Sequence, residues 1–156
     1  EETVRAGLAE CRPPQRRLQL SEANGIRILD DAYNANIDSV NASLGVLADL
    51  PCEGRRIVVL GSMAELGEET CAAHKEAGQS AAVLAIDVLM AVGEEAEVTV
   101  AAARAAGLDD AVAFADNVTV GDALCECAQP GDVVLIKGSR AARLEEVGEY
   151  LSKRKT

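Results

Sequence analysis

The chain has 156 residues, of which 49% are apolar, so it is about the size of one ordinary domain and can bury a proper core. Its 15 basic residues are outnumbered by 26 acidic ones, which gives a formal net charge of −11, and its aromatic residues are only Tyr33, Phe114 and Tyr150. This composition offers neither a footprint for a phosphate backbone nor a platform for base stacking, which argues against nucleic acid as a partner. No apolar run approaches the roughly 20 residues that a membrane-spanning helix needs.

The cysteines are odd in number and lack paired C-x-x-C spacing, which favours neither a disulfide framework nor a metal site; they are Cys11, Cys52, Cys71, Cys125 and Cys127. Reduced thiols fit a reducing cytoplasm, where we expect the protein to work. The first eleven residues are typical of the tail of a helix that lacks an N-terminal cap, and no initiator Met precedes them. We therefore expect residues 1–12 to be a linker or the end of a preceding domain, and residues 13–156 to form the domain.

Along the chain, short apolar runs alternate with amphipathic stretches. Residues 17–20 and 26–29 flank Ser21 to Gly25, and the Asn24-Gly25 pair within that segment predicts a β-hairpin. Helices are predicted over 38–50, 68–84, 95–106, 118–128 and from about 140 to 153, and they alternate with strands at 56–60, 88–92, 111–114 and 132–136. This alternation predicts an α/β fold: a doubly wound, mostly parallel sheet with Rossmann-like topology and a leading hairpin.

In sheets of this kind, ligands bind beyond the carboxyl ends of the strands. Polar or glycine-rich segments follow three of the predicted strands, at residues 30–36, 61–67 and 137–140. Each has a purely structural alternative, because Asn and Asp also cap helices and Gly also supplies positive φ. Their gathering at one edge nevertheless favours a binding site.

The most informative of these segments is Lys137-Gly138-Ser139-Arg140, between a buried strand and the predicted last helix. Backbone N–H groups at a helix start have no partners within the helix and lie at the positive end of its dipole, and two cationic side chains are added here. We therefore predict a site for a carboxylate or phosphate. The alternative is that Ser139 only caps the helix while Lys137 and Arg140 are solvated.

Two cofactor motifs are absent from the sequence. There is no G-x-x-x-x-G-K-[ST] phosphate loop and no G-x-G-x-x-G dinucleotide fingerprint, so neither a complete ATP site nor a nicotinamide enzyme is indicated. The single histidine, His74, has no obvious Ser or Cys nucleophile beside it. We expect it to be a partly buried, hydrogen-bonded residue.

Residues 30–36, residues 60–68 followed by His74, and residues 134–140 resemble the C-terminal domain of the Mur ligases. They are most similar to the Mur ligases that join D-Ala-D-Ala to a UDP-N-acetylmuramoyl-tripeptide. The resemblance extends from about residue 14 to the last helix. Three positions depart from the family pattern, which usually has Pro at Ile37, often has Asp at Ser62, and has Gly at Arg16.

The resemblance implies a three-domain bacterial enzyme of peptidoglycan synthesis in the cytoplasm. In such enzymes the first domain holds the UDP-sugar, and the central domain carries the ATP phosphate loop and the Mg²⁺ ligands. ATP phosphorylates the tripeptide carboxylate, and the amine of D-Ala-D-Ala attacks the resulting acyl phosphate. This chain would be the third domain, with residues 1–12 as the end of the central one; it would have no catalytic or metal-binding residue of its own and would be inactive alone.

The same resemblance assigns roles to eight residues. Those expected near the nucleotide are Arg17, Asp31, Tyr33, Asn34 and Asn36. Those expected to hold the carboxylate of D-Ala-D-Ala are Lys137, Ser139 and Arg140.

Two other readings remain open at this point. A response-regulator receiver domain also has an acidic pair after its first parallel strand and a Lys after its last, as Asp30-Asp31 and Lys137 would be. It needs an Asp after its third strand, where this sequence has Gly93-Glu94. A non-catalytic interaction domain is the remaining alternative.

Overall fold

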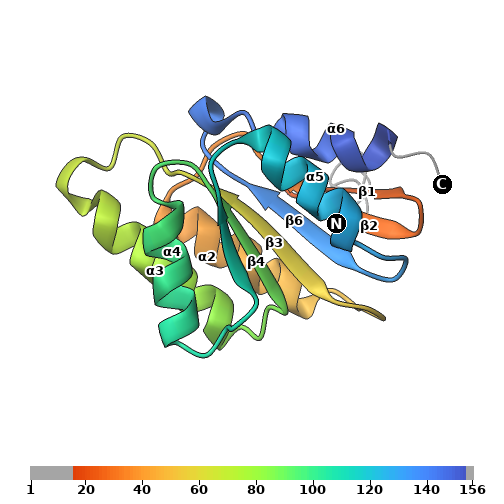
Figure 1. The fold of residues 1–156 in the computed structure, drawn as a ribbon, viewed down its shortest axis with the longest axis horizontal. Helices are drawn as coiled ribbons and strands as arrows, with labels where there is room; N and C mark the ends of the chain where they lie inside the picture. The colour runs from red at the N-terminus through yellow and green to blue at the C-terminus, as the bar shows by residue number, and fades with distance from the viewer. Residues whose placement is uncertain (1–15, 154–156) are drawn as a thin grey trace, which may run out of the picture.

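The computed structural model of the protein describes residues 16–153, so the predicted tail at residues 1–12 and Cys11 lie outside the described residues. A six-stranded sheet in the order β1-β2-β6-β3-β4-β5 forms its centre (Figure 1). Only β1 runs antiparallel to its neighbour, which confirms the predicted mostly parallel sheet with a leading hairpin. The strands are β1 (Gln19–Ala23), β2 (Ile26–Asp31), β3 (Arg56–Gly61), β4 (Val88–Val92), β5 (Ala111–Phe114) and β6 (Val133–Lys137).

The hairpin turn is tighter than predicted and consists of Asn24 and Gly25 alone. Both have positive φ, at 54° and 75°, as a two-residue hairpin turn with the native strand twist requires. The first strand also starts later than predicted, because Leu18 is left-handed, with φ 50°, and donates its N–H to Asp31 Oδ1 at 3.2 Å. This bond fixes the approach to β1 against the end of β2.

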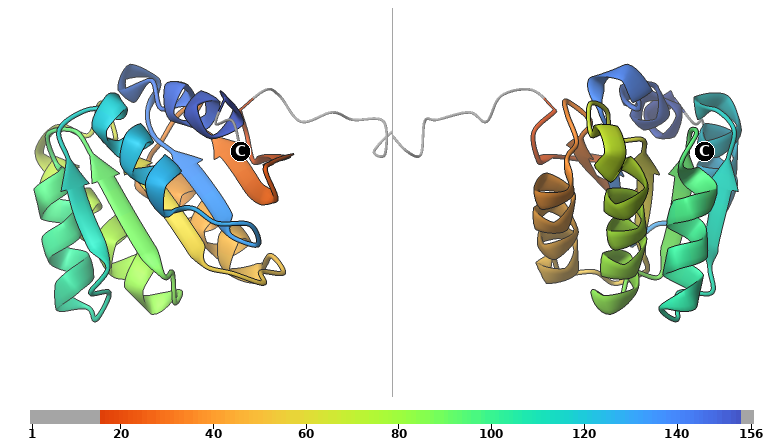
Figure 2. Two further views of the ribbon diagram at one scale, coloured as in Figure 1. Left: turned by 45° about the vertical axis from the view of Figure 1, so that its right-hand side comes forward. Right: turned by 90° about the vertical axis from the view of Figure 1, so that its left-hand side faces the viewer.

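Helices cover both faces of the sheet, as the doubly wound prediction required. Helices α2, α3 and α4 lie side by side on one face (Figure 2), and α5 and α6 pack together on the other. No helix within residues 16–153 is long and apolar enough to cross a lipid bilayer. The helices are α2 (Ile37–Asp49), α3 (Thr70–Val83), α4 (Ala96–Ala105), α5 (Asn117–Cys127) and α6 (Glu145–Lys153), with 3-10 turns η1 (Gly67–Glu69) and η2 (Arg140–Ala142).

Strand β6 shows why the predicted strands are continuous apolar runs. Val133 and Leu135 pack into the core under α2 to α4, whereas Val134 and Ile136 pack into the core under α5 and α6. All four are fully buried, because successive side chains of a strand point to opposite faces and both faces are covered here.

The prediction of one helix from about residue 140 to 153 is wrong. Residues 140–142 form only the 3-10 turn η2, Arg143 is left-handed with φ 51°, and α6 begins at Glu145. The break directs Leu144, which is fully buried, against Gly61 and Gly138 at the adjoining ends of β3 and β6. A Cβ on either glycine would come within 2.9 Å of Leu144 Cδ1, so these two glycines make room for it.

The strand order also separates this fold from the receiver alternative. In receiver domains the first parallel strand lies between the second and third. Here the first parallel strand, β2, pairs instead with the last strand, β6. The receiver interpretation is therefore not supported.

Candidate functional site

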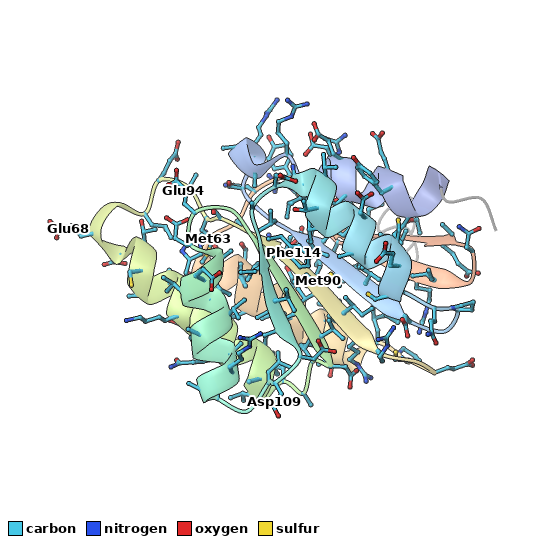
Figure 3. All side chains as sticks on the ribbon, in the orientation of Figure 1. Met63, Glu68, Met90, Glu94, Asp109 and Phe114 are labelled. Carbon is cyan, nitrogen blue, oxygen red and sulfur yellow. The ribbon has the colours of Figure 1, made fainter. Side chains whose placement is uncertain are left out.

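The carboxyl edge of the sheet has two clefts, one on each side of the end of β6. The chain leaves β6 toward the face covered by α5 and α6, whereas β2 and β3 lead to α2 and α3 on the opposite face. Such divergence opens crevices in which α/β proteins bind ligands. Figure 3 shows this edge at Met63 and Glu94, with Asp109 at the opposite end of the sheet.

The first of these, which we name the Lys137 cleft, lies between the ends of β2 and β6 and has a volume of about 360 Å³. Five of its lining residues are those predicted to meet a nucleotide, and a sixth is Lys137. The lining comprises Arg17, Leu18, Asp31, Tyr33, Asn34, Asn36, Ser39, Ala42, Ser43 and Lys137.

Lys137 forms the floor of its cleft, with only 2% of its side chain exposed. Its Nζ lies 2.8 Å from Asp31 Oδ2 and donates to the carbonyl oxygen of Asn34 at 2.6 Å. Asp31 Oδ2 also accepts from Ser43 Oγ at 2.6 Å. Lys137 and Asp31 are therefore largely satisfied by each other and by the protein, and the strand end is braced to α2.

Asp30, beside this pair, is half-buried. Burial raises the pKa of its carboxyl group, partly offset by the Ala32 N–H, which donates to Asp30 Oδ1 at 3.1 Å, and by the nearby charge of Arg16. Arg16 in turn forms an ion pair with Glu145 at 3.0 Å. These contacts hold the 30–34 segment in place from both sides.

The rim of the Lys137 cleft carries the groups that are open to a ligand. Tyr33 is 42% exposed, and the guanidinium carbon of Arg17 lies 4.7 Å from the centroid of its ring. Arg140 approaches the same ring at 6.0 Å. Within residues 16–153, neither arginine forms an ion pair with an acidic side chain.

Asn36 has the structural role that its residue type also allowed. It is the N-cap of α2: its Oδ1 accepts from the Ser39 N–H at 2.8 Å, and Ser39 Oγ accepts from the Asn36 N–H at 3.1 Å. This capping box forms although Ile37 stands where the family usually has Pro. Asn36 is exposed at the cleft, so a capping role and a ligand contact are compatible.

The second cleft, which we name the Ser139 cleft, has a volume of about 690 Å³ and is lined by the segments after β3, β4, β5 and β6. No Lys or Arg lines it, and its charged residues are Glu94, Glu95, Asp116 and Glu146. Glu146 is paired with Arg143, and Asp116 caps α5. The N–H of Thr119 donates to Asp116 Oδ1 and lowers the pKa of that carboxyl group.

Ser139 is 2% exposed and is held by its backbone, which donates from N–H to the Ser62 carbonyl oxygen at 3.2 Å. Its hydroxyl does not cap η2. The prediction of an anion site at the start of an α-helix is therefore wrong in its geometry. A 3-10 segment of one turn begins here instead of an α-helix. The structure also separates the predicted trio: Ser139 lines the second cleft, Lys137 the first, and Arg140 approaches Tyr33.

His74 is hydrogen-bonded, as expected, and is more deeply buried than expected. Its Nε2 accepts the Met63 N–H at 3.0 Å, and its Nδ1 lies 2.7 Å from the Thr70 carbonyl oxygen. Because the amide can only donate and the carbonyl can only accept, the proton lies on Nδ1. His74 thus fixes the segment after β3 to α3 at the wall of the Ser139 cleft.

Sequence reasoning missed Ser43 and Asn117. Ser43 is a buried hydroxyl on the apolar face of α2, between Val40 and Leu47, and a polar residue at such a position was the available signal. Asn117 Nδ2 donates to the Ala142 carbonyl oxygen at 2.9 Å and ties α5 to η2. No signal in the sequence indicated that second contact. Across residues 16–153, no group of three or more His, Cys, Asp or Glu side chains is placed to hold a metal ion.

Comparison with known proteins identifies the family. Residues 16–140 match the family model described as "Mur ligase, glutamate ligase domain". The chain belongs to the Mur ligase family. This match covers β1 to β6 and both clefts up to Arg140.

Two curated relatives of this Mur ligase domain are UDP-N-acetylmuramoyl-tripeptide–D-alanyl-D-alanine ligases. The Escherichia coli protein is 35% identical over 99% of this chain and 33% of its own length. The Mycobacterium tuberculosis protein is 39% identical over 96% of this chain and 34% of its own length. The chain thus spans about a third of the curated relatives it matches.

Solved structures agree with this assignment. A crystal structure of MurF from Acinetobacter baumannii superimposes with a TM-score of 0.87 at 27% identity, over 98% of this chain and 34% of that one. MurF ligase from Thermotoga maritima, solved in complex with ADP, superimposes with a TM-score of 0.79 at 30% identity, over 94% of this chain and 32% of that one.

Proposed function

We propose that this chain is the C-terminal domain of a UDP-N-acetylmuramoyl-tripeptide–D-alanyl-D-alanine ligase, an ATP-dependent enzyme of the bacterial cytoplasm that joins D-Ala-D-Ala to the UDP-linked tripeptide. The observation that carries the proposal is the pair of clefts that flank β6 at the carboxyl edge of the sheet. They lie within a chain that is 35% and 39% identical, over nearly its whole length, to two ligases of that name.

The Lys137 cleft suits the nucleotide. It offers the exposed side chain of Tyr33, a guanidinium at Arg17 that has no acidic partner within residues 16–153, and amide side chains at Asn34 and Asn36. The Tyr33 ring supports the Arg17 guanidinium, which can bind phosphate oxygens in two-point fashion. Asp31 retains acceptor capacity at Oδ1 beside the Leu18 N–H, so its carboxylate would face a ribose hydroxyl. When bound, ATP supplies the phosphoryl group that activates the tripeptide carboxylate.

The dipeptide carboxylate is best assigned to the boundary between the two clefts, at Ser139 and Arg140, because the charged residues that line the Ser139 cleft itself are all acidic. The Ser139 hydroxyl is not used as a helix cap, and Arg140 is exposed and has no acidic partner within residues 16–153. Together they would hold the dipeptide carboxylate so that the amine at the other end faces the activated tripeptide. Lys137 would support this site indirectly, through the Asp31 and Asn34 contacts that shape the segment next to Arg140.

By the resemblance to these ligases, Mg²⁺ and the phosphate loop would belong to the central domain of the same protein, and the UDP-sugar to its N-terminal domain. The isolated chain should therefore fold without releasing ADP from ATP, with or without D-Ala-D-Ala. Turnover by the chain alone at about 1 s⁻¹ or above, typical of a whole enzyme, would contradict the proposed division of labour.

The decisive experiment compares two arginines in the full-length ligase. Arg17→Ala should raise the KM for ATP, whereas Arg140→Ala should lower kcat/KM for D-Ala-D-Ala by roughly tenfold to a hundredfold, as expected for a charged hydrogen bond to a carboxylate. Arg104→Ala is the matched control, because Arg104 is exposed, lies in the last turn of α4 and lines neither cleft. If Arg140→Ala leaves dipeptide kcat/KM within about twofold of the wild type, the substrate assignment is wrong.

A further inference from the structure

The ring of Tyr33 faces both of the arginines that are assigned to different substrates. Its ring lies 4.7 Å from the guanidinium carbon of Arg17 and 6.0 Å from that of Arg140. These distances are within the range at which an aromatic face attracts a cation. Because a tyrosine ring is neutral, it can hold both guanidinium groups without cancelling the charge that each presents to a ligand.

The backbone around Tyr33 is fixed, which makes the ring a firm support. The Tyr33 N–H donates to the Arg16 carbonyl oxygen at 3.3 Å. On one side of Tyr33, the Ala32 N–H is bound by Asp30, and on the other the Asn34 carbonyl accepts from buried Lys137 at 2.6 Å. Three consecutive residues are therefore anchored, although Tyr33 as a residue is 42% exposed.

Arg140 needs such a support. It follows Ser139, which is buried in the wall of one cleft, but its own side chain is exposed and extends toward the ring that lines the other. A long, exposed arginine samples many rotamers, and binding a carboxylate in two-point geometry requires one of them. Contact with a fixed ring restricts that freedom before the ligand arrives, and preorganisation of this kind increases affinity.

We propose that Tyr33 is a positioning residue that holds Arg140 for the carboxylate of the amino substrate and thereby couples that site to the nucleotide in the Lys137 cleft. The two guanidinium groups repel each other across the ring, and a phosphate on Arg17 reduces that repulsion. A nucleotide therefore favours the ring-bound arrangement of Arg140, and by linkage the dipeptide favours the nucleotide in return. This inference rests on the proposed function.

The test uses the full-length ligase with Tyr33→Phe, Tyr33→Leu, Arg140→Ala and the double variant Tyr33→Leu/Arg140→Ala. The KM for D-Ala-D-Ala is measured at saturating ATP and saturating tripeptide. Tyr33→Leu, which removes the aromatic face, should raise that KM about twofold to fivefold, as expected for loss of an exposed cation–π contact. Tyr33→Phe keeps the face and should stay within about twofold of the wild type.

The double variant decides between positioning and other roles. If Tyr33 acts through Arg140, Tyr33→Leu should have no further effect on dipeptide KM once Arg140 is alanine. An equal effect in both backgrounds, or a change in the KM for ATP alone, would overturn the inference while leaving the proposed function intact. A ligase in which Arg140→Ala itself has no effect on the dipeptide would instead overturn the substrate assignment, and this inference with it.

Coupling gives a second measurement that a purely structural role would not change. In the wild-type ligase, binding of a non-hydrolysable ATP analogue should be tighter in the presence of D-Ala-D-Ala, and Tyr33→Leu should reduce that enhancement toward unity. Arg104→Ala, which removes an exposed arginine of α4 that lines neither cleft, should leave it unchanged. An enhancement that is the same in wild type and Tyr33→Leu would contradict the coupling.

Discussion

Strand β6 has an ion pair at each end, and the two pairs are similar in length but differ in what surrounds them. Just before the strand, Asp132 Oδ2 lies 2.9 Å from Arg55 Nη2; at its end, Lys137 Nζ lies 2.8 Å from Asp31 Oδ2. Asp132 also accepts hydrogen bonds from the backbone N–H groups of Arg55 and Gln129, so this pair joins the loops that precede β3 and β6. Around Lys137, by contrast, exposed polar side chains line a cleft.

This difference distinguishes an ion pair that only stabilises the fold from one that lies in a binding site. A buried ion pair alone does not indicate a functional site, because ion pairs with a purely structural role are also buried and also have shifted pKa values. At the carboxyl end, Lys137 and Asp31 neutralise each other. The neighbouring side chains of Arg17, Tyr33 and Arg140 have no acidic partners in the described part of the chain, which distinguishes this end. The predictions below test that distinction at both ends.

The largest effect on stability is expected from Lys137→Ala. This substitution leaves the Asp31 carboxylate buried without its cation, and breaking a buried pair in this way costs about 3–5 kcal/mol in free energy of unfolding. Urea denaturation of the isolated chain measures it. Adding Asp31→Asn removes the unpaired charge and should recover part of the loss; a loss below about 1 kcal/mol for Lys137→Ala would show that the pair contributes little.

At the other end, Asp132→Asn should destabilise the chain by about 1–3 kcal/mol, because an amide cannot replace both carboxylate oxygens as acceptors. In the full-length ligase, the KM values for ATP and dipeptide should not change, since this end carries no proposed site. Asp109→Asn is the matched control, an exposed acid at the same end of the sheet (Figure 3). A raised KM for either substrate would contradict a purely structural role for the Asp132 pair.

The two ends should also respond oppositely to pH. Burial by itself raises the pKa of Asp132, but the hydrogen bonds from the Arg55 N–H, the Arg55 guanidinium and the Gln129 N–H outweigh it and lower that pKa. The stability that Asp132 contributes is therefore complete above its unfolded pKa of about 3.9 and is lost as pH falls through the lower folded value. Asp30, whose pKa is raised by burial, has the reverse sign, and its contribution is lost as pH rises through its folded pKa.

Acid titration of the chain at a fixed, sub-denaturing urea concentration checks this sign. The wild type should lose stability more steeply below about pH 4 than Asp132→Asn, which lacks the titrating group. Asp30→Asn should not flatten that acid limb. Equal steepness in the wild type and Asp132→Asn would show that another carboxylate controls acid unfolding.

The sequence predicted the layers of the fold well because the relevant signals are local. Continuous β-branched runs indicated strands buried on both faces, and Asn24-Gly25 indicated the hairpin. It failed at residues 140–144, where the chain breaks its helix so that Leu144 can pack on Gly61 and Gly138. Gly61 lies at a strand end some eighty residues earlier in the chain, so helical periodicity near residue 140 cannot indicate this contact.

The site was predictable in residue type but not in pairing. The polar segments at the carboxyl edge could be located from the strand pattern, and six of the eight predicted site residues do line one cleft. The partner of Lys137 could not be located, because its bonds to Asp31 and Asn34 span 106 and 103 residues. A lysine in a motif indicates available charge, and only the fold shows whether that charge is already engaged.

The smallest expected effect concerns Asn36, which both caps α2 and lines the Lys137 cleft. Asn36→Ala should cost about 1 kcal/mol of unfolding free energy, whereas Asn36→Ser should cost almost nothing, because a serine hydroxyl caps equally well. Neither variant keeps the amide, so both should raise the KM for ATP in the full-length ligase by about threefold or more if the amide binds the nucleotide. Thermal melting of the chain and ATP kinetics of the ligase separate the two roles. If Asn36→Ser restores the KM for ATP as well as the stability, Asn36 has only a structural role at the carboxyl edge, like the residues around Asp132 at the opposite end.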